Sequence, residues 1–165
     1  MTLIDIMIDQ ISSTRLFVED DGEAIPVWRI ATPEGCYLIF TRFDHDKPQQ
    51  RERVLLLISR FMAWKMATSF VLTVQTWLGA DVTRPGDEVL LVVGVSRHER
   101  MGLVQRITGR DPVSFGTPEW LMPDQVDETY VRLLPTGRGE ISIEEIAELT
   151  RIFGKDGEMA AERLS

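Results

Sequence analysis

Hydrophobic residues in the first part of the chain follow a helical spacing and then shorter strand-like runs. The helical set after Thr2 consists of Leu3, Ile4, Met7, Ile8 and Ile11. It predicts a helix over about residues 3–11 with Thr2 as its N-cap. Runs of apolar and β-branched residues then predict strands at residues 15–19, 25–30 and 36–43. The turn-rich segments between them are short, which favours an antiparallel meander.

A long helix is predicted to begin at Asp46. That residue precedes Pro48 and Gln49, which supplies a cap, a proline tolerated in the first turn and a capping-box glutamine. Apolar positions continue to about Ala67 over a wide face, so we expect this helix to be the central one. Beyond it, residues 70–78 and 89–95 predict two antiparallel strands, joined by a loop.

Two capping boxes predict helices in the last part of the chain. The segment Ser96-Arg97-His98-Glu99 predicts a helix over about residues 97–107, and Ser142 predicts another that ends near Phe153. Residues 109–123 are rich in proline and glycine and predict an irregular loop. Residues 124–134 fit either a short helix or a strand. The final residues 155–165 carry few large apolar groups, so we expect them to fray.

Together these elements predict an α+β fold. We expect a single domain over residues 1–154, with residues 155–165 as a C-terminal tail. Its core is expected to be one antiparallel sheet of about five strands, with the long central helix on one face and shorter helices flanking it. The other face also needs a cover, from a terminal helix or from a second copy of the chain. The latter alternative is a homodimer.

Composition excludes several classes of protein. A chain of 165 residues that is 44% hydrophobic can bury a core without disulfide bonds. The single cysteine, Cys36, excludes an internal disulfide framework and any multi-cysteine metal site. Asp5 and Asp9 interrupt the N-terminal apolar run, and no later run reaches the roughly 18 apolar residues of a membrane span. We therefore expect a soluble, cytoplasmic protein with no membrane partner.

Charge is unevenly distributed along the chain. The net charge of −8 makes the protein acidic and disfavours a nucleic-acid partner. Residues 1–41 carry 2 basic and 7 acidic side chains (−5), residues 42–110 carry 11 and 7 (+4), and residues 111–165 carry 5 and 12 (−7). The basic middle part fits either solvated arginine-rich helix faces or a local site for an anion or a partner.

Two carboxylates flank a histidine in the segment Asp44-His45-Asp46. With His98, the only other histidine, this trio forms a candidate site for a divalent metal. Asp44, His45 and His98 would then be the catalytic candidates of a metal-dependent hydrolase or nuclease. The same trio also fits a polar turn in which Asp46 only caps the following helix.

The segment from residue 96 to residue 100 is a second candidate site. Ser96, Arg97 and Arg100 surround the start of the helix predicted over residues 97–107. Free backbone N–H groups in a first helical turn bind anions, and neighbouring arginines would favour a phosphorylated or other small anionic ligand. The alternative is that these are ordinary surface side chains, because the capping box already accounts for Glu99.

The predicted order of a helix, three strands, a helix and a strand resembles the core of the PD-(D/E)XK nucleases. Those enzymes carry E-x-K or D-x-K on the third strand, and residues 36–43 contain neither an acid nor a lysine, so the resemblance is one of topology alone. The sequence also lacks a nucleophile elbow and a phosphate-binding glycine loop. No cofactor is predicted. We expect a non-enzymatic module that binds a protein partner or a small ligand, with the metal-dependent hydrolase and the anion-binding protein as alternatives.

Overall fold

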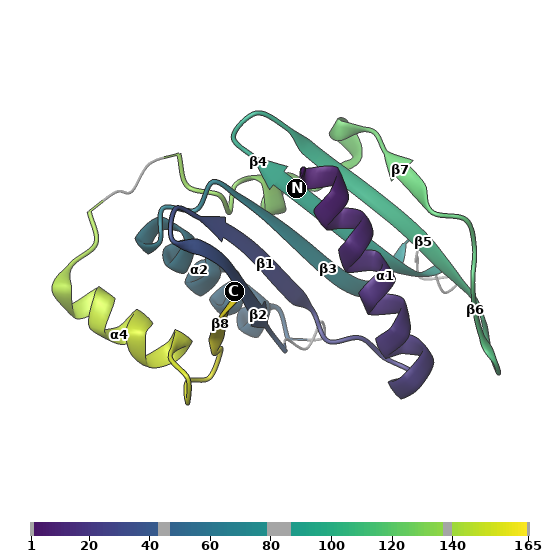
Figure 1. The fold of residues 1–165 in the computed structure, drawn as a ribbon, viewed down its shortest axis with the longest axis horizontal. Coiled ribbons are helices and arrows are strands. Elements are labelled where there is room, and N and C mark those ends of the chain that lie inside the picture. The colour runs from purple at the N-terminus through teal and green to yellow at the C-terminus, as the bar shows by residue number, and fades with distance from the viewer. Residues whose placement is uncertain (1, 43–46, 79–86, 137–139, 165) are drawn as a thin grey trace.

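A computed structural model describes residues 2–42, 47–78, 87–136 and 140–164. It has one antiparallel sheet with helices on both faces, which confirms the α+β class (Figure 1). The sheet has eight strands rather than about five, in the order β6-β5-β4-β3-β1-β2-β8, with β7 also paired to β5. The strands are β1 Val27–Thr32, β2 Gly35–Phe40, β3 Ser69–Leu78, β4 Asp87–Ser96, β5 Arg100–Arg110, β6 Val113–Phe115, β7 Glu119–Leu121 and β8 Ala161–Leu164.

The first helix, α1 (Leu3–Asp21), is twice as long as its sequence pattern predicts. Its predicted cap is confirmed: the Thr2 hydroxyl accepts a hydrogen bond from the Asp5 backbone N–H at 3.2 Å, and the Asp5 carboxylate accepts one from Thr2 N–H. The strand expected at residues 15–19 is wrong, because the buried spacing continues through Thr14 and Val18. Gly22, with φ of +80°, ends the helix in the left-handed conformation that glycine adopts easily.

The second helix, α2 (Pro48–Trp64), follows the β1–β2 hairpin. Lys47 is its N-cap and Pro48 stands in the first turn, as the sequence predicts. The expected cap, Asp46, lies outside the described residues. Because α1 has 19 residues and α2 has 17, and they cover opposite sheet faces, α2 is not the single central helix that we expected.

The prediction of a helix over residues 97–107 is wrong, since most of this segment belongs to β5. Ser96 and Glu99 close a hairpin turn between β4 and β5, in which Ser96 N–H donates to the Glu99 carbonyl at 2.9 Å. The Ser96 hydroxyl accepts hydrogen bonds from the N–H groups of His98 and Glu99 within this turn, as it would at a helix N-terminus. Pairing with β4 over residues 100–106 decides in favour of the strand.

The segment expected to be an irregular loop contains two short strands. β6 and β7 both add to the outer edge of β5. After them come a 3₁₀ turn, η1 (Pro123–Gln125), and a short helix, α3 (Glu128–Val131). Of the two alternatives for residues 124–134, a short helix or a strand, the structure therefore has the helix.

The C-terminal part is ordered against the rest of the sheet. α4 (Ile143–Phe153) begins after its predicted cap, Ser142, whose hydroxyl accepts a hydrogen bond from Glu145 N–H at 3.1 Å. Within residues 155–165, which we expected to fray, β8 pairs with β2 and Met159 is only 4% exposed. One buried apolar residue and one strand are sufficient to attach this segment.

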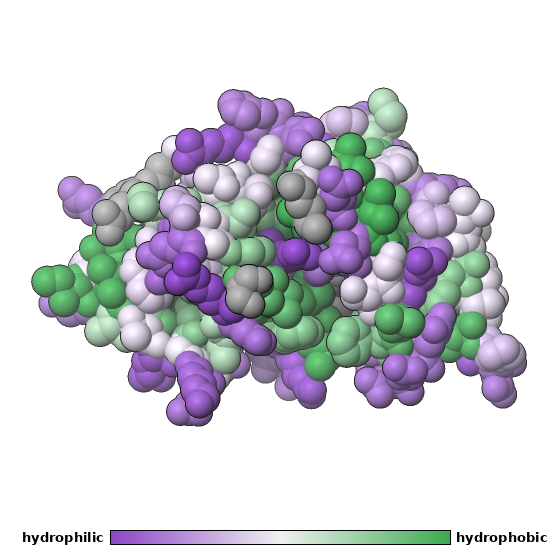
Figure 2. Space-filling model, viewed as in Figure 1, coloured by the Kyte–Doolittle hydropathy of each residue, from purple (hydrophilic) through white to green (hydrophobic). Residues whose placement is uncertain are grey.

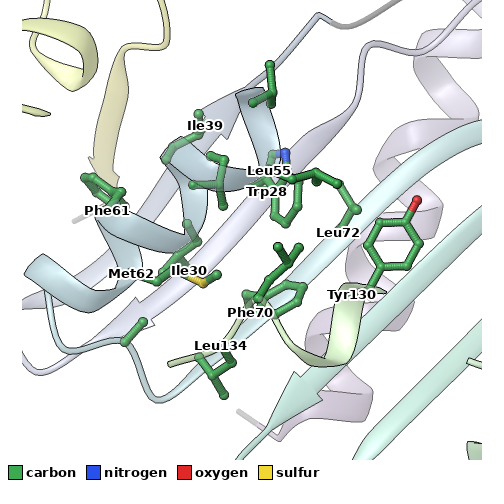
Figure 3. Packing of buried hydrophobic residues seen from close by; sticks show 14 of the residues in the cluster. Trp28, Ile30, Ile39, Leu55, Phe61, Met62, Phe70, Leu72, Tyr130 and Leu134 are labelled. Atoms are coloured by element: carbon green, nitrogen blue, oxygen red, sulfur yellow. The ribbon is translucent and has the colours of Figure 1, made fainter. Parts of the chain in front are cut away.

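Two hydrophobic cores lie on opposite faces of the sheet. The larger one lies between the sheet and α2, α3 and α4 and contains Trp28, Phe61 and Phe70 (Figure 3). The smaller one lies beneath α1 and contains Met7, Ile11 and residues of β3, β4 and β5. The terminal helix α1 therefore covers part of the second sheet face, which is one of the two covers that we expected. No helix in the described part of the chain is long and apolar enough to cross a membrane.

Candidate functional site

A large cleft lies at one end of the sheet, beside the C-terminal end of α1. Its volume is about 920 Å³, within the range of ligand sites. The lining residues come from α1 and the turn after it, from β1 to β5, from Arg42 after β2, and from the first turn of α2. Hydrophobic residues gather in the lower middle of the molecule in Figure 2, between the positions of β2 and the C-terminal half of α1 in Figure 1.

Three aromatic side chains from separate elements line this cleft: Phe17 of α1, Phe40 of β2 and Trp77 of β3. They are 50%, 44% and 56% exposed, whereas Trp28 and Phe70 in the core are almost fully buried. Half-exposed aromatic groups gathered around a hollow are typical of binding surfaces, because each offers a large apolar area with few rotatable bonds.

An acidic cluster, Glu19, Asp20, Asp21 and Glu23, lies at the C-terminal end of α1 beside the cleft, and all four side chains are exposed. The C-terminal end of a helix is its negative end, so acidic groups there are unfavourable for the helix. Arg110 compensates in part, since it donates a hydrogen bond to the Gly22 carbonyl and pairs with Glu88. The last turn of α1 itself contains no basic residue.

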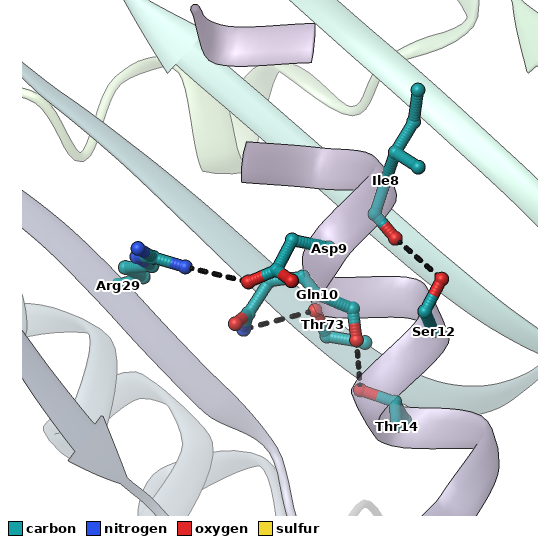
Figure 4. A network of polar contacts seen from close by, with 7 residues as sticks. All are labelled: Ile8, Asp9, Gln10, Ser12, Thr14, Arg29 and Thr73. Carbon is teal, nitrogen blue, oxygen red and sulfur yellow. Dashed lines mark hydrogen bonds and ion pairs between the residues drawn. The ribbon is translucent and has the colours of Figure 1, made fainter. Parts of the chain in front are cut away.

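Polar contacts hold α1 over the sheet and so define one wall of the cleft. Arg29 of β1 forms an ion pair with Asp9 at 3.0 Å, and Gln10 donates a hydrogen bond to the Thr73 hydroxyl at 3.3 Å (Figure 4). Gln10 and Thr73 are both buried, so this bond satisfies two polar groups within the smaller core. On the other wall, the Gln75 side chain accepts a hydrogen bond from Ala24 N–H at 2.9 Å, which fixes the turn after α1.

The predicted metal and catalytic site cannot be assembled from the described residues. Asp44, His45 and Asp46 lie outside them, and His98 is exposed in the β4–β5 turn. Within residues 2–42, 47–78, 87–136 and 140–164, no group of three or more histidine, cysteine, aspartate or glutamate residues could hold a metal ion. The metal-dependent hydrolase therefore stays a prediction.

The predicted anion site is spread over the β4–β5 hairpin rather than a helix N-terminus. The Ser96 hydroxyl already accepts hydrogen bonds from the N–H groups of residues 98 and 99. Arg100 forms an ion pair with Glu128 of α3. Arg97 is exposed. Anion binding by Ser96, Arg97 and Arg100 stays a prediction, without the helical N–H groups that supported it.

Sequence reasoning missed the cleft residues. The sequence predicts Phe17 in a strand over residues 15–19 and Trp77 in a strand over residues 70–78, and it indicates neither as a binding group. A continuous helical pattern through Val18 was the one signal that could have placed Phe17 and the acidic cluster on the same helix end. Comparison with known proteins adds no assignment, since no family model, curated protein or solved structure matches this chain.

Proposed function

We propose that this protein is a non-enzymatic interaction module whose cleft binds a segment of a partner protein that carries both apolar anchors and basic residues. The observation that supports this function is the group of half-exposed aromatic side chains Phe17, Phe40 and Trp77 around one cleft. Such groups account for most of the binding energy in protein interfaces when a partner removes them from water.

The charged residues in and around the cleft favour a partner segment that carries basic residues. Among the residues that the structure describes, five charged residues line the cleft, and three acids (Asp21, Glu23 and Glu88) exceed two arginines (Arg42 and Arg110) by one charge. Glu19 and Asp20 extend the negative surface along α1, at the helix end whose dipole is also negative. Lysine or arginine beside the apolar anchors of the partner would relieve this repulsion and accelerate association.

A second copy of the chain fits this surface less well. Each copy has a net charge of −8 and the same acidic helix end, so self-association through the cleft would bring like charges together. Light scattering distinguishes the two occupants. We expect a mass near that of one chain, and a mass near two chains that Trp77→Ala returns to one would assign the cleft to a homodimer instead.

The test is a titration with two designed peptides of equal length, one of alternating leucine and lysine and one of alternating leucine and glutamate. We expect the leucine–lysine peptide to bind and the leucine–glutamate peptide not to bind, and added salt should weaken the binding. Trp77→Ala should weaken the affinity by about tenfold or more, because an aromatic anchor is lost.

The matched control is Trp120→Ala. Trp120 of β7 is 47% exposed, close to the exposure of Trp77, and it does not line the cleft. Equal losses in Trp77→Ala and Trp120→Ala would show that the peptide adheres to any exposed indole, and this would contradict the proposal. Equal binding of the two peptides would contradict the charge argument.

A further inference from the structure

A second, smaller pocket lies on the other face of the sheet. Side chains alternate between faces along β3, so Gln75 and Trp77 line the cleft while Thr76 and Leu78 line this pocket. Its volume is about 450 Å³, the size of a small-molecule site. Among the described residues, half of the ten that line it are aliphatic: Leu78, Leu91, Val93, Leu121 and Val126.

Two hydrogen-bond donors, Arg51 of α2 and Tyr130 of α3, meet at this pocket. Nη2 of Arg51 donates to the Tyr130 hydroxyl oxygen at a long 3.4 Å, and the guanidinium carbon lies 5.9 Å from the centre of the Tyr130 ring. Tyr130 is 8% exposed, and its hydroxyl points away from Phe70 and Leu134 (Figure 3).

The hydrogen-bonding capacity of this pair is only partly used. Nε of Arg51 is buried and has no hydrogen-bond partner in the described part of the chain. Among the same residues, no carboxylate forms an ion pair with Arg51, and no acceptor receives the Tyr130 O–H proton. Buried donors without acceptors are costly, and a guanidinium is the group best suited to an oxyanion.

We infer that this pocket binds a small monoanionic carboxylate with an apolar body. The carboxylate accepts hydrogen bonds from Arg51 and from the Tyr130 hydroxyl, while the apolar body lies against the aliphatic wall. Such a ligand pairs its charge with the Arg51 guanidinium, takes the free Tyr130 hydroxyl proton as a hydrogen bond, and buries apolar surface at the same time. This site does not depend on the function proposed for the cleft.

Asp127 also lines the pocket and limits the charge of the ligand. Its carboxylate accepts a hydrogen bond from Thr129 N–H at 2.9 Å and caps α3. Among the described lining residues, one guanidinium and one carboxylate leave the pocket wall close to neutral. A dianionic phosphate would therefore meet repulsion that a single carboxylate, placed against Arg51, largely avoids.

The test uses 4-phenylbutyrate as the probe, with 4-phenylbutanol as its uncharged analogue and inorganic phosphate as an anion without an apolar body. Calorimetry or NMR titration of the full chain measures the dissociation constants. We expect 4-phenylbutyrate to bind about tenfold or more tightly than either comparison compound. Arg51→Gln should remove about that preference, and Tyr130→Phe, which keeps the ring in the core, should weaken binding less.

The matched control is Arg53→Gln. Arg53 stands two residues away on the same helix, but it pairs with Glu158 and does not line the pocket. This variant should keep the affinity within about twofold of the unmodified chain. Equal binding of acid and alcohol, or an unchanged affinity in both Arg51→Gln and Tyr130→Phe, would overturn the inference. Absence of binding by 4-phenylbutyrate would overturn it as well. None of these three results bears on the function proposed for the cleft.

Discussion

Met7 of α1 lies directly against Gly94 of β4. A Cβ atom added at residue 94 would stand 2.6 Å from the Met7 sulfur and 3.2 Å from Cγ of Leu3. Met7 is completely buried, so it has little room to move. The absence of a side chain at this one strand position lets α1 approach the sheet and form one wall of the cleft.

Gly94→Ala should therefore destabilise the protein. The clash with Met7 outweighs the gain from replacing a strand glycine, and we expect a loss of about 1–2 kcal/mol in the free energy of unfolding. Urea denaturation measures this loss. Gly116→Ala is the matched control, since its added Cβ would lie 3.5 Å from Thr108, an ordinary contact. A Gly94→Ala variant as stable as Gly116→Ala would contradict the close packing of α1.

Met159 anchors the C-terminal segment in the larger core. It is 4% exposed and precedes β8, which pairs with β2. Met159→Ala should cost about 2–4 kcal/mol in the free energy of unfolding, because it leaves a cavity in a packed core. Met122→Ala, at a residue that is 65% exposed, should cost less than about 0.5 kcal/mol. Similar small losses in both variants would support a frayed C-terminal tail.

Two ion pairs make the packing of the C-terminal part on α2 sensitive to acid. Hydrogen bonds from Arg60 and Arg53 lower the pKa values of Glu145 and Glu158 below their ordinary value of 4.5. A carboxyl whose pKa is lower in the folded state stabilises the protein above its unfolded pKa. That stabilisation is lost as the pH falls through the folded pKa.

Unfolding measured from pH 7 downward should show this loss once the pH falls below about 4.5. The double variant Glu145→Gln and Glu158→Gln should have a weaker dependence of the unfolding free energy on pH in that range. Glu52→Gln, at an exposed position of α2, should retain the full dependence. An identical pH dependence in the double variant and the unmodified chain would show that these pairs contribute nothing.

Local signals predicted the helix starts well. The caps at Thr2 and Ser142 are confirmed, because the hydroxyl of a cap accepts a hydrogen bond from a backbone N–H only three residues away. The capping box at Ser96 misled the prediction. Met101, Val104 and Ile107 fit a helical spacing, yet pairing with β4 decides the conformation, and such pairing is not visible locally.

The candidate site was less predictable than the fold. Phe17, Phe40 and Trp77 are separated by at least 23 residues along the chain, and only the register of β1, β2 and β3 brings them to one cleft. Arg51 and Tyr130 are likewise distant in sequence. Tertiary packing, rather than any short motif, creates both sites.

The most direct test of the proposed function is an NMR titration of the indole N–H signals with the leucine–lysine peptide. The chain has four tryptophans, which give separate probes of the surface and the core. We expect the Trp77 signal to shift on titration, while Trp28, which donates to the Thr41 hydroxyl in the core, and Trp120, outside the cleft, remain unchanged. A shift of Trp120 without a shift of Trp77, or no shift of any indole signal, would contradict binding at the cleft.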